Sequence, residues 1–489
     1  MVMLAEGKLY IDGKVREAAG GARFADVGPW TGDIVGYAAD ASREDMDEAI
    51  KSARRAFDQT DWSSNAAQRR DLVARLGASL RANRERLVAL ARIEGGGAMG
   101  AVFGPLVDIP LAAFGPLLRV FDTLEWEKDL GAREVFGIRS NLKVVREAAG
   151  VVGAITPWNV PLYISVGKVV PALLAGCAVI LKPAPETPLM GAILGELAHE
   201  VGFPPGVFNV VTSKEPAALG EMLVTDKRVD LISFTGSTAV GKRIMEKGAP
   251  TLKRLFLELG GKSASIILDD APDFAAAVAQ NIVCFHAGQG CAISTRLLVP
   301  RKRYEEAVAV LQQAYGAYAA MWGDIDAPMN VMGPVISARQ RDRVMSYIEA
   351  GKAEGARLLA GGNAVNNKGA GFFVEPTCFV DVTNDMRIAR EEIFGPVLVV
   401  IPFEDDDDAV AIANDSDYGL SGAVRSGNLE RALHVAKRIR TGTVGVNGGM
   451  WLAADVPFGG YKQSGMGKEW GLEGFDEYLE TKSLGIGAN

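Results

Sequence analysis

The sequence predicts an α/β fold with more than one sheet, and two features of the chain support this prediction. From about Val144 onwards, short β-branched runs alternate with stretches that have helical spacing. The expected strands are apolar almost throughout, which is typical of parallel strands covered by helices on both faces. The length of 489 residues suits about three structural units.

The first alternating block covers 151–260. We expect strands at 151–158, 178–184, 206–212, 229–236 and 254–260, and helices at 162–175, 188–202, around 216–224 and from 237 onwards. Parallel sheets of this kind bind ligands at the carboxyl ends of their strands. The loops after Trp158, Lys182 and Gly236 are therefore the expected binding loops.

A second block, from Ser263 to about Phe458, has the same texture. It contains the apolar runs SASIILDD, RLLVP, VLVVIPF and TVGVN, with helices expected at 303–321 and 338–354. Ahead of both blocks, 42–57 has acidic residues early and basic residues late, as suits a helix dipole, and 66–91 predicts one or two more helices. The stretch 95–114 has no clear period and stays unassigned, and 125–144 and 473–489 fit neither block.

Composition excludes several classes of protein. Hydrophobic residues make up 48% of the chain and charged residues 23%, which is enough apolar surface for a folded core. The net charge is −8 and the only basic cluster is Arg301–Arg303, so we expect no nucleic-acid partner. The uncharged stretch 148–167 contains glycines and prolines that would leave backbone groups unsatisfied in lipid. With four dispersed cysteines and no apolar leader, we expect a cytoplasmic protein without disulfides or a membrane partner.

The loop FTGSTAVGK at 234–242 joins an expected strand to an expected helix. It satisfies the GxxxxGK spacing of a P-loop, but the next residue is Arg243, where a P-loop needs Ser or Thr for magnesium. The loop also lacks the third glycine of a dinucleotide fingerprint. Amides at a helix start would suit a pyrophosphate, and a turn without a ligand is the alternative.

Cys291, in HAGQGCAIS, is the one cysteine with small, flexible neighbours, and a catalytic and a structural role are both open. A metal site made of Cys284, His286 and Cys291 is conceivable, but the chain has no second ligand pair with zinc spacing, so we expect no metal. With three histidines in the chain, the general base is more simply a carboxylate. Glu258, at the end of an expected strand, is the candidate, and an ordinary surface carboxylate is the alternative. The Asn159 amide could stabilise an oxyanion or simply form a turn.

Nine collinear segments together resemble the aldehyde dehydrogenase superfamily. They are ITPWNVPL (155–162), VILKPAPETP (179–188), FTGSTAVGK (234–242), LELGGKS (257–263), GQGC (288–291), MGPVIS (332–337), EEIFGPV (391–397), YGLSGAV (418–424) and PFGGYKQSGMGKEWG (457–471). The resemblance implies a Rossmann-like cofactor domain (1–124 and 145–259), a second α/β catalytic domain (260–462), and a small β bridging element for oligomerisation (125–144 and 473–489). It also implies a homodimer or homotetramer.

The resemblance further implies oxidation of an aldehyde to a carboxylic acid with NAD or NADP. Cys291 matches the nucleophile, Asn159 with the Cys291 amide matches the oxyanion hole, and Glu258 matches the base that hydrolyses a thioester. The residues matched to cofactor binding are Ile155, Thr156, Pro157, Trp158, Lys182, Pro185, Glu186, Phe234, Gly236, Ser237, Gly241, Leu259, Gly260, Glu392 and Phe394. Those matched to the substrate tunnel are Val160, Tyr163, Ile164, Ala292, Met450, Trp451 and Phe458.

Two departures from the family concern the adenosine end of the cofactor. Many NAD-selective members have an acidic residue where this chain has Pro185, so the choice between NAD and NADP stays open, and Glu186, one position later, could partly substitute. Of two closely spaced glycines after the third strand, only Gly220 has a match. The tunnel residues are largely apolar, which indicates a medium-chain aliphatic, terpenoid or aromatic aldehyde. The alternatives are a CoA-acylating dehydrogenase, which would tend to lack Glu258, a non-enzymatic structural member, which would lack Cys291, and a P-loop-like NTPase.

Overall fold

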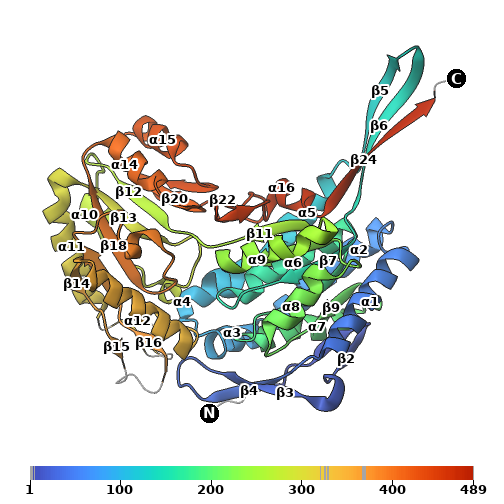
Figure 1. Cartoon of the computed structure of the whole chain (residues 1–489), viewed down its shortest axis with the longest axis horizontal. Coiled ribbons are helices and arrows are strands. Elements are labelled where there is room, and N and C mark those ends of the chain that lie inside the picture. Colours follow the sequence, from blue (N-terminus) through green and yellow to red (C-terminus); the bar gives the residue numbers. More distant parts are fainter. Residues whose placement is uncertain are drawn as a thin grey trace.

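The computed structural model describes residues 4, 6–319, 321–323, 327, 330–365 and 371–487. Two helix-covered sheets lie side by side, and a narrow three-stranded arm projects from the first of them (Figure 1). The expected α/β class is confirmed, with one sheet for each alternating block.

The first sheet has the order β2-β1-β9-β8-β7-β10-β11-β23. Its members are β1 (Leu9–Ile11), β2 (Lys14–Arg16), β7 (Val151–Ile155), β8 (Ala178–Lys182), β9 (Phe208–Val210), β10 (Leu231–Thr235), β11 (Arg254–Glu258) and β23 (Gly465–Met466). The five strands from β9 to β11 are parallel, and these are the five expected from the sequence. All five end earlier than predicted at their carboxyl ends, β10 by a single residue. In β7, β8, β9 and β11 the chain leaves the sheet ahead of Pro157, Pro183, the polar pair Thr212–Ser213 and Gly260.

Both faces of this sheet are covered by helices, as its continuous apolar strands require. Along β8, Ala178 and Ile180 pack into the cluster that contains α1 (Arg43–Gln59) and α8 (Pro216–Thr225). The alternate residues of β8 pack into a second cluster with residues of α2, α6 and α7. These helices are α2 (Ala66–Ala82), α6 (Pro161–Ala175) and α7 (Pro188–Val201), and α9 (Thr238–Gly248) follows β10.

Chain order creates a crevice in this sheet. From β7 the chain proceeds outward through β8 to β9, and it then returns to the other side of β7 to form β10 and β11. The loops that leave β7 and β10 therefore turn to opposite faces, and ligands bind in the crevice between such loops.

The second sheet has the order β14-β17-β18-β13-β12-β20-β21, all parallel except β14. Its strands are β12 (Ser263–Ile267), β13 (Ser294–Pro300), β14 (Arg357–Ala360), β17 (Thr377–Val380), β18 (Val397–Phe403), β20 (Ser421–Arg425) and β21 (Thr443–Val446). Its helices are α10 (Phe274–Ala279), α11 (Tyr304–Tyr318), α12 (Ala338–Ala353), α13 (Arg387–Arg390), α14 (Asp406–Asn414) and α15 (Leu429–Arg438). Only 259–262 separate β11 from β12, so the chain crosses directly from one sheet to the other.

The unassigned stretch 95–114 contains α4 (Met99–Ala101), a π-helical turn at Val102–Leu106 and the start of α5 (Asp108–Thr123). Gly104 is non-helical and Pro105 follows it, which hides the helical period in the sequence. Among the described residues, Met99–Thr123 is the one helical segment long and apolar enough to cross a membrane by length and composition. Phe114 and Leu117 are buried, and a Cβ on Gly77 of α2 would lie 2.7 Å from the Phe114 ring, so α5 packs closely on α2.

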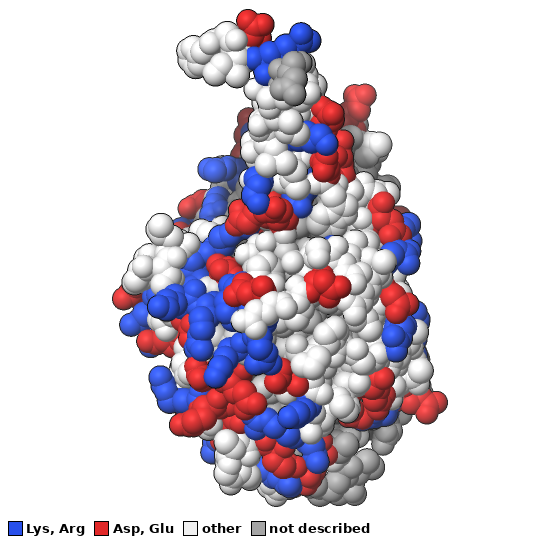
Figure 2. All heavy atoms as spheres, turned by 90° about the vertical axis from the view of Figure 1, so that its right-hand side faces the viewer, with Lys and Arg blue, Asp and Glu red and all other residues white. Residues whose placement is uncertain are grey.

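The two segments that fit neither block pair with each other in the arm. Strands β5 (Glu127–Val135) and β6 (Ile138–Ala148) form a hairpin, and β24 (Leu479–Gly487) pairs with β6 over its whole length. Figure 2 shows the arm standing clear of the body, above a face with charges of both signs and a broad area without them. Its two outer strands leave unpaired backbone edges, and such edges favour pairing with another chain.

The remaining elements are short and peripheral. They are β3 (Arg23–Val27), β4 (Ile34–Ala39), α3 (Arg84–Ile93), β15 (Ala364–Val365), β16 (Phe373–Val374), β19 (Tyr418–Gly419), β22 (Tyr461–Lys462) and α16 (Gly471–Asp476). The acidic run at 404–408 begins a helix, with Asp405 as the N-cap of α14.

Candidate active site

Two adjoining cavities occupy the crevice. The first, of about 560 Å³, is lined by the predicted residues Pro157, Trp158, Asn159, Ile164, Gly236, Ser237, Leu259, Gly260, Cys291, Glu392 and Phe394. The second, of about 530 Å³, is lined by Ile155, Thr156, Pro157, Trp158, Lys182, Pro185, Glu186, Phe234 and Gly236, together with Gly220. Residues separated by more than two hundred positions thus meet at the edge of the first sheet that faces the second.

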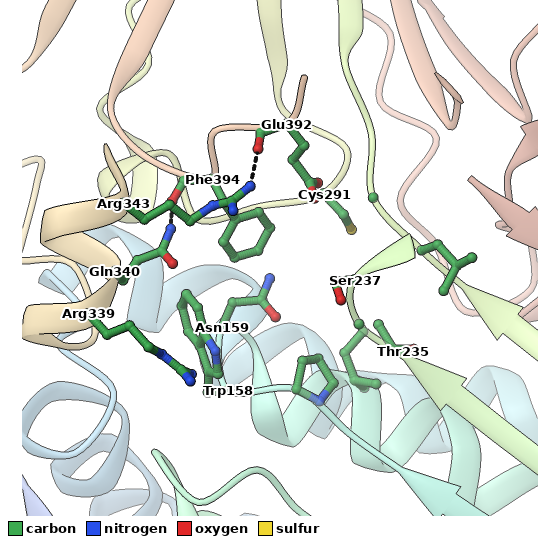
Figure 3. A pocket seen from close by; sticks show the side chains of 15 residues that line it. Trp158, Asn159, Thr235, Ser237, Cys291, Arg339, Gln340, Arg343, Glu392 and Phe394 are labelled. Atoms are coloured by element: carbon green, nitrogen blue, oxygen red, sulfur yellow. Dashed lines mark hydrogen bonds between the residues drawn. The ribbon is translucent and has the colours of Figure 1, made fainter. Parts of the chain in front are cut away.

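The loop after β7 supplies Asn159 to the first cavity. Asn159 is buried, and its Nδ2 donates to the backbone carbonyl of Gln289 at 3.0 Å. An amide nitrogen has two protons, so one remains for a ligand. Figure 3 shows the Asn159 amide and the Cys291 sulfur on opposite sides of one space, with Ser237 and Phe394 beside them.

Gln289 holds the loop that carries Cys291. Its Oε1 accepts from the Ile336 amide at 2.8 Å, and its Nε2 donates to the His286 carbonyl at 3.1 Å. His286 and Ala287 have φ of 46° and 52°, a conformation that side chains other than glycine rarely adopt. Such backbone strain clusters at functional sites. The segment 332–337 therefore serves to hold the Cys291 loop, a role that the sequence motif alone does not reveal.

Glycines bring three of the motifs into backbone contact. A Cβ on Gly261 would lie 2.4 Å from the Cys291 carbonyl oxygen, and one on Gly288 would lie 2.1 Å from the Gly395 carbonyl oxygen. A Cβ on Gly260 would lie 2.4 Å from Glu392 Oε2. The crossing between the sheets, the Cys291 loop and the segment 391–397 thus require glycine where they touch.

The segment 391–397 is held from α12 by residues that the sequence did not single out. Gln340 Nε2 donates to the Phe394 carbonyl and Arg343 Nη2 to the Glu392 carbonyl, each at 2.7 Å (Figure 3). Both residues also line the first cavity, as does Arg339. Helix α12 was expected, but its polar residues resemble an ordinary solvated face, and the one available signal was their position directly after 332–337.

Glu392 and Phe394 present different chemistry to the cavity. The Phe394 and Trp158 rings pack edge to face, with their centroids 5.3 Å apart. Glu392 accepts from the Gly261 amide at 2.9 Å, and burial raises the pKa of its carboxyl to about 7, against the opposing effects of that amide, Arg343 and Lys262. This pair offers a flat apolar wall and an acceptor for hydroxyl groups.

Glu258 lies at the carboxyl end of β11, as expected, but among the residues that line neither cavity. It is buried, and neither of its carboxylate oxygens has a hydrogen-bond partner in the described structure. Burial and then the Glu469 carboxylate raise its pKa well above the usual range, while Lys168 and Lys468 oppose this. Glu258 is therefore a stronger base than an exposed carboxylate and is not an ordinary surface residue.

Behind Glu258 lies a buried ion pair that the sequence analysis missed. Lys168 Nζ of α6 lies 2.6 Å from Glu469 Oε1 and donates to Ser233 Oγ at 3.0 Å. Both charged side chains are almost completely buried. Lysine in an apolar helix and glutamate in a C-terminal loop carry no sequence signal that they pair across about 300 positions.

The surroundings of Cys291 keep its thiol protonated. Burial raises the pKa of the Cys291 thiol, and the Glu258, Glu392 and Glu469 carboxylates raise it further. Only its own backbone amide acts in the opposite direction. A thiolate at this position needs a nearby base or added positive charge.

The loop after β10 forms the boundary between the two cavities. Ser237 is the N-cap of α9, and its Oγ accepts from the Val240 amide. Gly236 lines both cavities, whereas Gly241 lies in α9, where a Cβ would come within 2.6 Å of Leu259. Arg243 binds Glu221 at 2.5 Å. A guanidinium is cationic and has no acceptor atom, so Arg243 cannot ligate magnesium as the Ser or Thr of a P-loop does.

The predicted substrate residues are placed unevenly. Ile164 lines the first cavity, and Tyr163 packs on Trp470 close enough to Cys291 for the thiol to affect the Tyr163 pKa. Val160, Ala292 and Trp451 are partly buried and pack against the same core cluster as Cys291, and the Trp451 ring stacks on the Phe458 ring with centroids 5.2 Å apart. Met450 is 80% exposed. Of the predicted substrate residues, Ile164 is therefore the one that shares the first cavity with Cys291, and Met450 lies at the surface.

Metal binding has no support from the described residues, among which no group of three or more His, Cys, Asp or Glu could hold an ion. Burial lowers the pKa of His286 to about 4. His286 is therefore neutral, and Cys284 beside it is a buried thiol whose pKa burial raises to about 12.

Known proteins match this chain over nearly its whole length. The model of the aldehyde dehydrogenase family matches residues 15–484. A 3-succinoylsemialdehyde-pyridine dehydrogenase from Pseudomonas sp. is 42% identical over 483 residues, 98% of each chain. Betaine aldehyde dehydrogenase from Staphylococcus aureus in complex with NAD⁺ has a TM-score of 0.94 at 36% identity, over 99% of this chain and 95% of that one. A mutant of aldehyde dehydrogenase C from Pseudomonas syringae, solved with NAD⁺ and octanal, has a TM-score of 0.91 at 39% identity, over 98% and 96% of the two chains.

Proposed function

Because this chain belongs to the aldehyde dehydrogenase family and is an NAD(P)-dependent enzyme, we propose that it oxidises an apolar aldehyde to the carboxylic acid through an adduct on Cys291. One observation carries the proposal. Cys291, Asn159, Glu392 and Phe394 line a single cavity, although they come from three separate segments of the chain.

The residues present suit a nicotinamide dinucleotide. Gly236 and Ser237 expose the start of α9 where a diphosphate would lie, and a Cβ on Gly236 would fill that space and meet the Phe234 ring at 2.5 Å. Glu392 and Phe394 would hold the nicotinamide ribose and ring, and Lys182 the adenosine ribose. Burial lowers the pKa of Lys182 to about 8, while the Glu186 carboxylate opposes this. The bound cofactor supplies the hydride acceptor.

Cys291 performs the covalent step. Its sulfur attacks the aldehyde carbon as the thiol releases its proton to solvent, and a carbon–sulfur bond forms while the carbonyl π bond opens. The negative charge then develops on the former carbonyl oxygen. Asn159 Nδ2 and the Cys291 amide are fixed donors for that oxygen, and such donors are worth about 10²–10³ in rate. After loss of hydride the acyl group remains on Cys291 as a thioester.

Glu258 completes the reaction by removing a proton from water as the water attacks the thioester carbon. The carbon–sulfur bond breaks, the carboxylic acid leaves, and Glu258 returns the proton taken from water to the Cys291 sulfur. The raised pKa of Glu258 suits this task, because a base works best when its pKa is near the operating pH. A CoA-acylating enzyme would need no such base, so the position of Glu258 favours hydrolysis.

The apolar side chains at the predicted substrate positions support an apolar substrate. Ile164 lines the cavity that contains Cys291, and the Trp451 ring stacks on the Phe458 ring. The octanal complex of the Pseudomonas syringae enzyme agrees with a medium-chain aliphatic aldehyde, and terpenoid and aromatic aldehydes fit the same chemistry. Preferred turnover of betaine aldehyde or succinic semialdehyde would contradict this part of the proposal.

We propose the domain organisation that the family resemblance implies. Residues 1–124 and 145–259 bind the cofactor, 260–462 form the catalytic domain, and 125–144 with 473–489 form the bridging element. At the turn of the arm, Val135, Phe136 and Ile138 are 57%, 99% and 66% exposed. An exposed apolar tip together with free strand edges favours contact with a second copy of the chain, which supports a homodimer or homotetramer. Four free cysteines support a cytoplasmic location.

The test follows the absorbance of reduced nicotinamide with a panel of aldehydes and either NAD⁺ or NADP⁺. Cys291→Ala should abolish reduction, whereas Glu258→Gln should give one burst of reduced cofactor followed by turnover about 10²–10⁴ slower. Full steady-state turnover by Glu258→Gln would disprove the assigned base. Formation of acyl-CoA in preference to the acid, when CoA is added, would establish the acylating alternative.

A further inference from the structure

The second cavity carries an excess of positive charge. The charged side chains that line it are five basic and two acidic, namely Lys182, Lys214, Arg243, Lys247 and Arg339 against Glu186 and Glu221. Since the first cavity contains Cys291, the nicotinamide end must lie there, and the second cavity is left for adenosine. The adenosine end is therefore the basic end of the site.

Both carboxylates in this cavity are already paired. Glu221 lies 2.5 Å from Arg243 and 3.6 Å from Lys247. Glu186 lies 3.0 Å from Arg339. Among the described residues, Lys182 and Lys214 form no ion pair. The cavity therefore offers cations in excess and no unpaired carboxylate that would repel an anion.

Arg339 occupies a special place in this arrangement. It belongs to α12, on the second sheet's side, whereas Glu186 follows β8 of the first sheet, so the pair spans the crevice. Arg339 lines both cavities, and in Figure 3 it extends toward Trp158. Its partner Glu186 lines the second cavity only, so the pair lies on the side of the junction where the adenosine ribose would follow the diphosphate.

The Arg339–Glu186 pair is easily opened, because the Arg339 side chain is 86% exposed and exposed pairs contribute little to stability. With NAD⁺, Glu186 is available to accept from a ribose hydroxyl. With NADP⁺, the guanidinium can turn to the ribose phosphate, which it binds as a fork of parallel donors. Pro185 places no carboxylate in the way.

We propose that Arg339 enables this enzyme to bind a cofactor phosphorylated on the adenosine ribose, so that it uses NADP⁺ as well as NAD⁺. The proposal rests on the proposed function, since it assumes that the two cavities hold the dinucleotide. Arg339 leaves Glu186 and binds the 2′-phosphate when NADP⁺ is present. Lys182 and Lys214 add to the positive potential around that phosphate.

The test measures binding of adenosine fragments to the whole protein by calorimetry, without any turnover. The ligands are 2′,5′-ADP and 5′-AMP, which differ only in the 2′-phosphate. Wild-type protein should bind 2′,5′-ADP at least about tenfold more tightly. Arg339→Gln should remove that preference and leave the affinity for 5′-AMP within about twofold. Arg341→Gln is the matched control, because Arg341 pairs with Asp342 and lines neither cavity.

Glu186→Gln should strengthen 2′,5′-ADP binding. The ratio of kcat/KM for NADP⁺ to that for NAD⁺ should be highest in Glu186→Gln, intermediate in wild type and lowest in Arg339→Gln. Equal weakening of both fragments by Arg339→Gln would assign Arg339 to the 5′-phosphate and overturn the proposal, and so would an unchanged preference. Aldehyde oxidation with NAD⁺ but without a 2′-phosphate preference would refute this inference alone. Absence of oxidation with either cofactor would refute the proposed function itself.

Discussion

The buried pair Lys168–Glu469 should set the pH range in which Glu258 acts. Glu469 raises the pKa of Glu258 and Lys168 lowers it, so the two partners act in opposite directions. We expect Glu469→Gln to extend turnover to lower pH and Lys168→Met to shift it to higher pH. A charge within about 4–6 Å moves a carboxyl pKa by about 1–3. In each variant, the acidic limb of the plot of kcat against pH should therefore move by about one pH unit.

The same substitutions have a cost in stability. Lys168 and Glu469 are 0% and 1% exposed at a separation of 2.6 Å, and loss of one partner of such a pair costs about 3–5 kcal/mol. The double variant Lys168→Met/Glu469→Gln should recover much of this loss, because no buried charge then remains unpaired. Thermal unfolding separates these effects from the effects on turnover.

The assay is the pH profile of kcat under conditions where hydrolysis of the thioester limits turnover. The control repeats both substitutions in the Glu258→Gln background, where residue 258 can no longer titrate and the opposite shifts should vanish. Shifts in the same direction, or shifts that persist without Glu258, would refute the assignment of Glu258 as the titrating base.

Three further predictions concern the packing around the site and the arm. Gly261→Ala places a Cβ 2.4 Å from the Cys291 carbonyl oxygen and should lower kcat by at least about tenfold, whereas Gly316→Ala, with open space around it, should leave steady-state kinetics unchanged and serves as the control. Alkylation of Cys291 by iodoacetamide should be slow at pH 7 and should accelerate above pH 9. The reason is that burial and the nearby carboxylates raise the pKa of the Cys291 thiol, whereas an ordinary thiol has a pKa of about 8.5. Fast, pH-independent labelling, measured by intact mass, would contradict this. Phe136→Asp should reduce the oligomer mass in sedimentation without changing the circular dichroism spectrum, and an unchanged mass would show that the arm's tip contributes nothing to assembly.

Regular elements were accessible from sequence because local patterning decides them. Residues 178–184 are apolar on both faces, and the structure buries β8 between two clusters of helices. The acidic start of 42–57 forms a capping box at Ser42, whose side chain accepts from the Asp45 amide. The stretch 95–114 could not be predicted, because a π-helical turn with Gly104 and Pro105 interrupts its period. Only packing against α2 and α6 restores the helix.

The site was accessible only in part, for a physical reason. Cys291, Asn159 and Glu392 lie in motifs, and the structure brings them to one cavity. Arg339 and Lys168 lie on helices whose sequence describes a solvated face and a core face, and their partners are 153 and 301 positions away. Local pattern contains no information on such pairings, because they depend on how two sheets are placed against each other.

The buried position of Glu258 should lower the free energy of unfolding at pH values where its carboxyl is ionised in the unfolded chain. Its pKa is raised well above its value in the unfolded chain. The folded state therefore favours the protonated form, and stability that is present below the unfolded pKa is lost as the pH rises toward the folded pKa. Glu258→Gln removes the titrating group, so the variant should exceed wild type in free energy of unfolding at pH 8 by about 0.5–2 kcal/mol.

That gain should shrink at pH 4, where the carboxyl is protonated in the folded state and mostly protonated in the unfolded chain, in which its pKa is about 4.3. Urea unfolding at the two pH values measures the difference directly, since it compares the variant with wild type under each condition. Equal stability at pH 8, or a variant less stable than wild type, would mean that Glu258 is solvated or paired in the folded protein. A solvated or paired carboxylate would be a weaker base, and the proposed hydrolysis would then lose its physical justification.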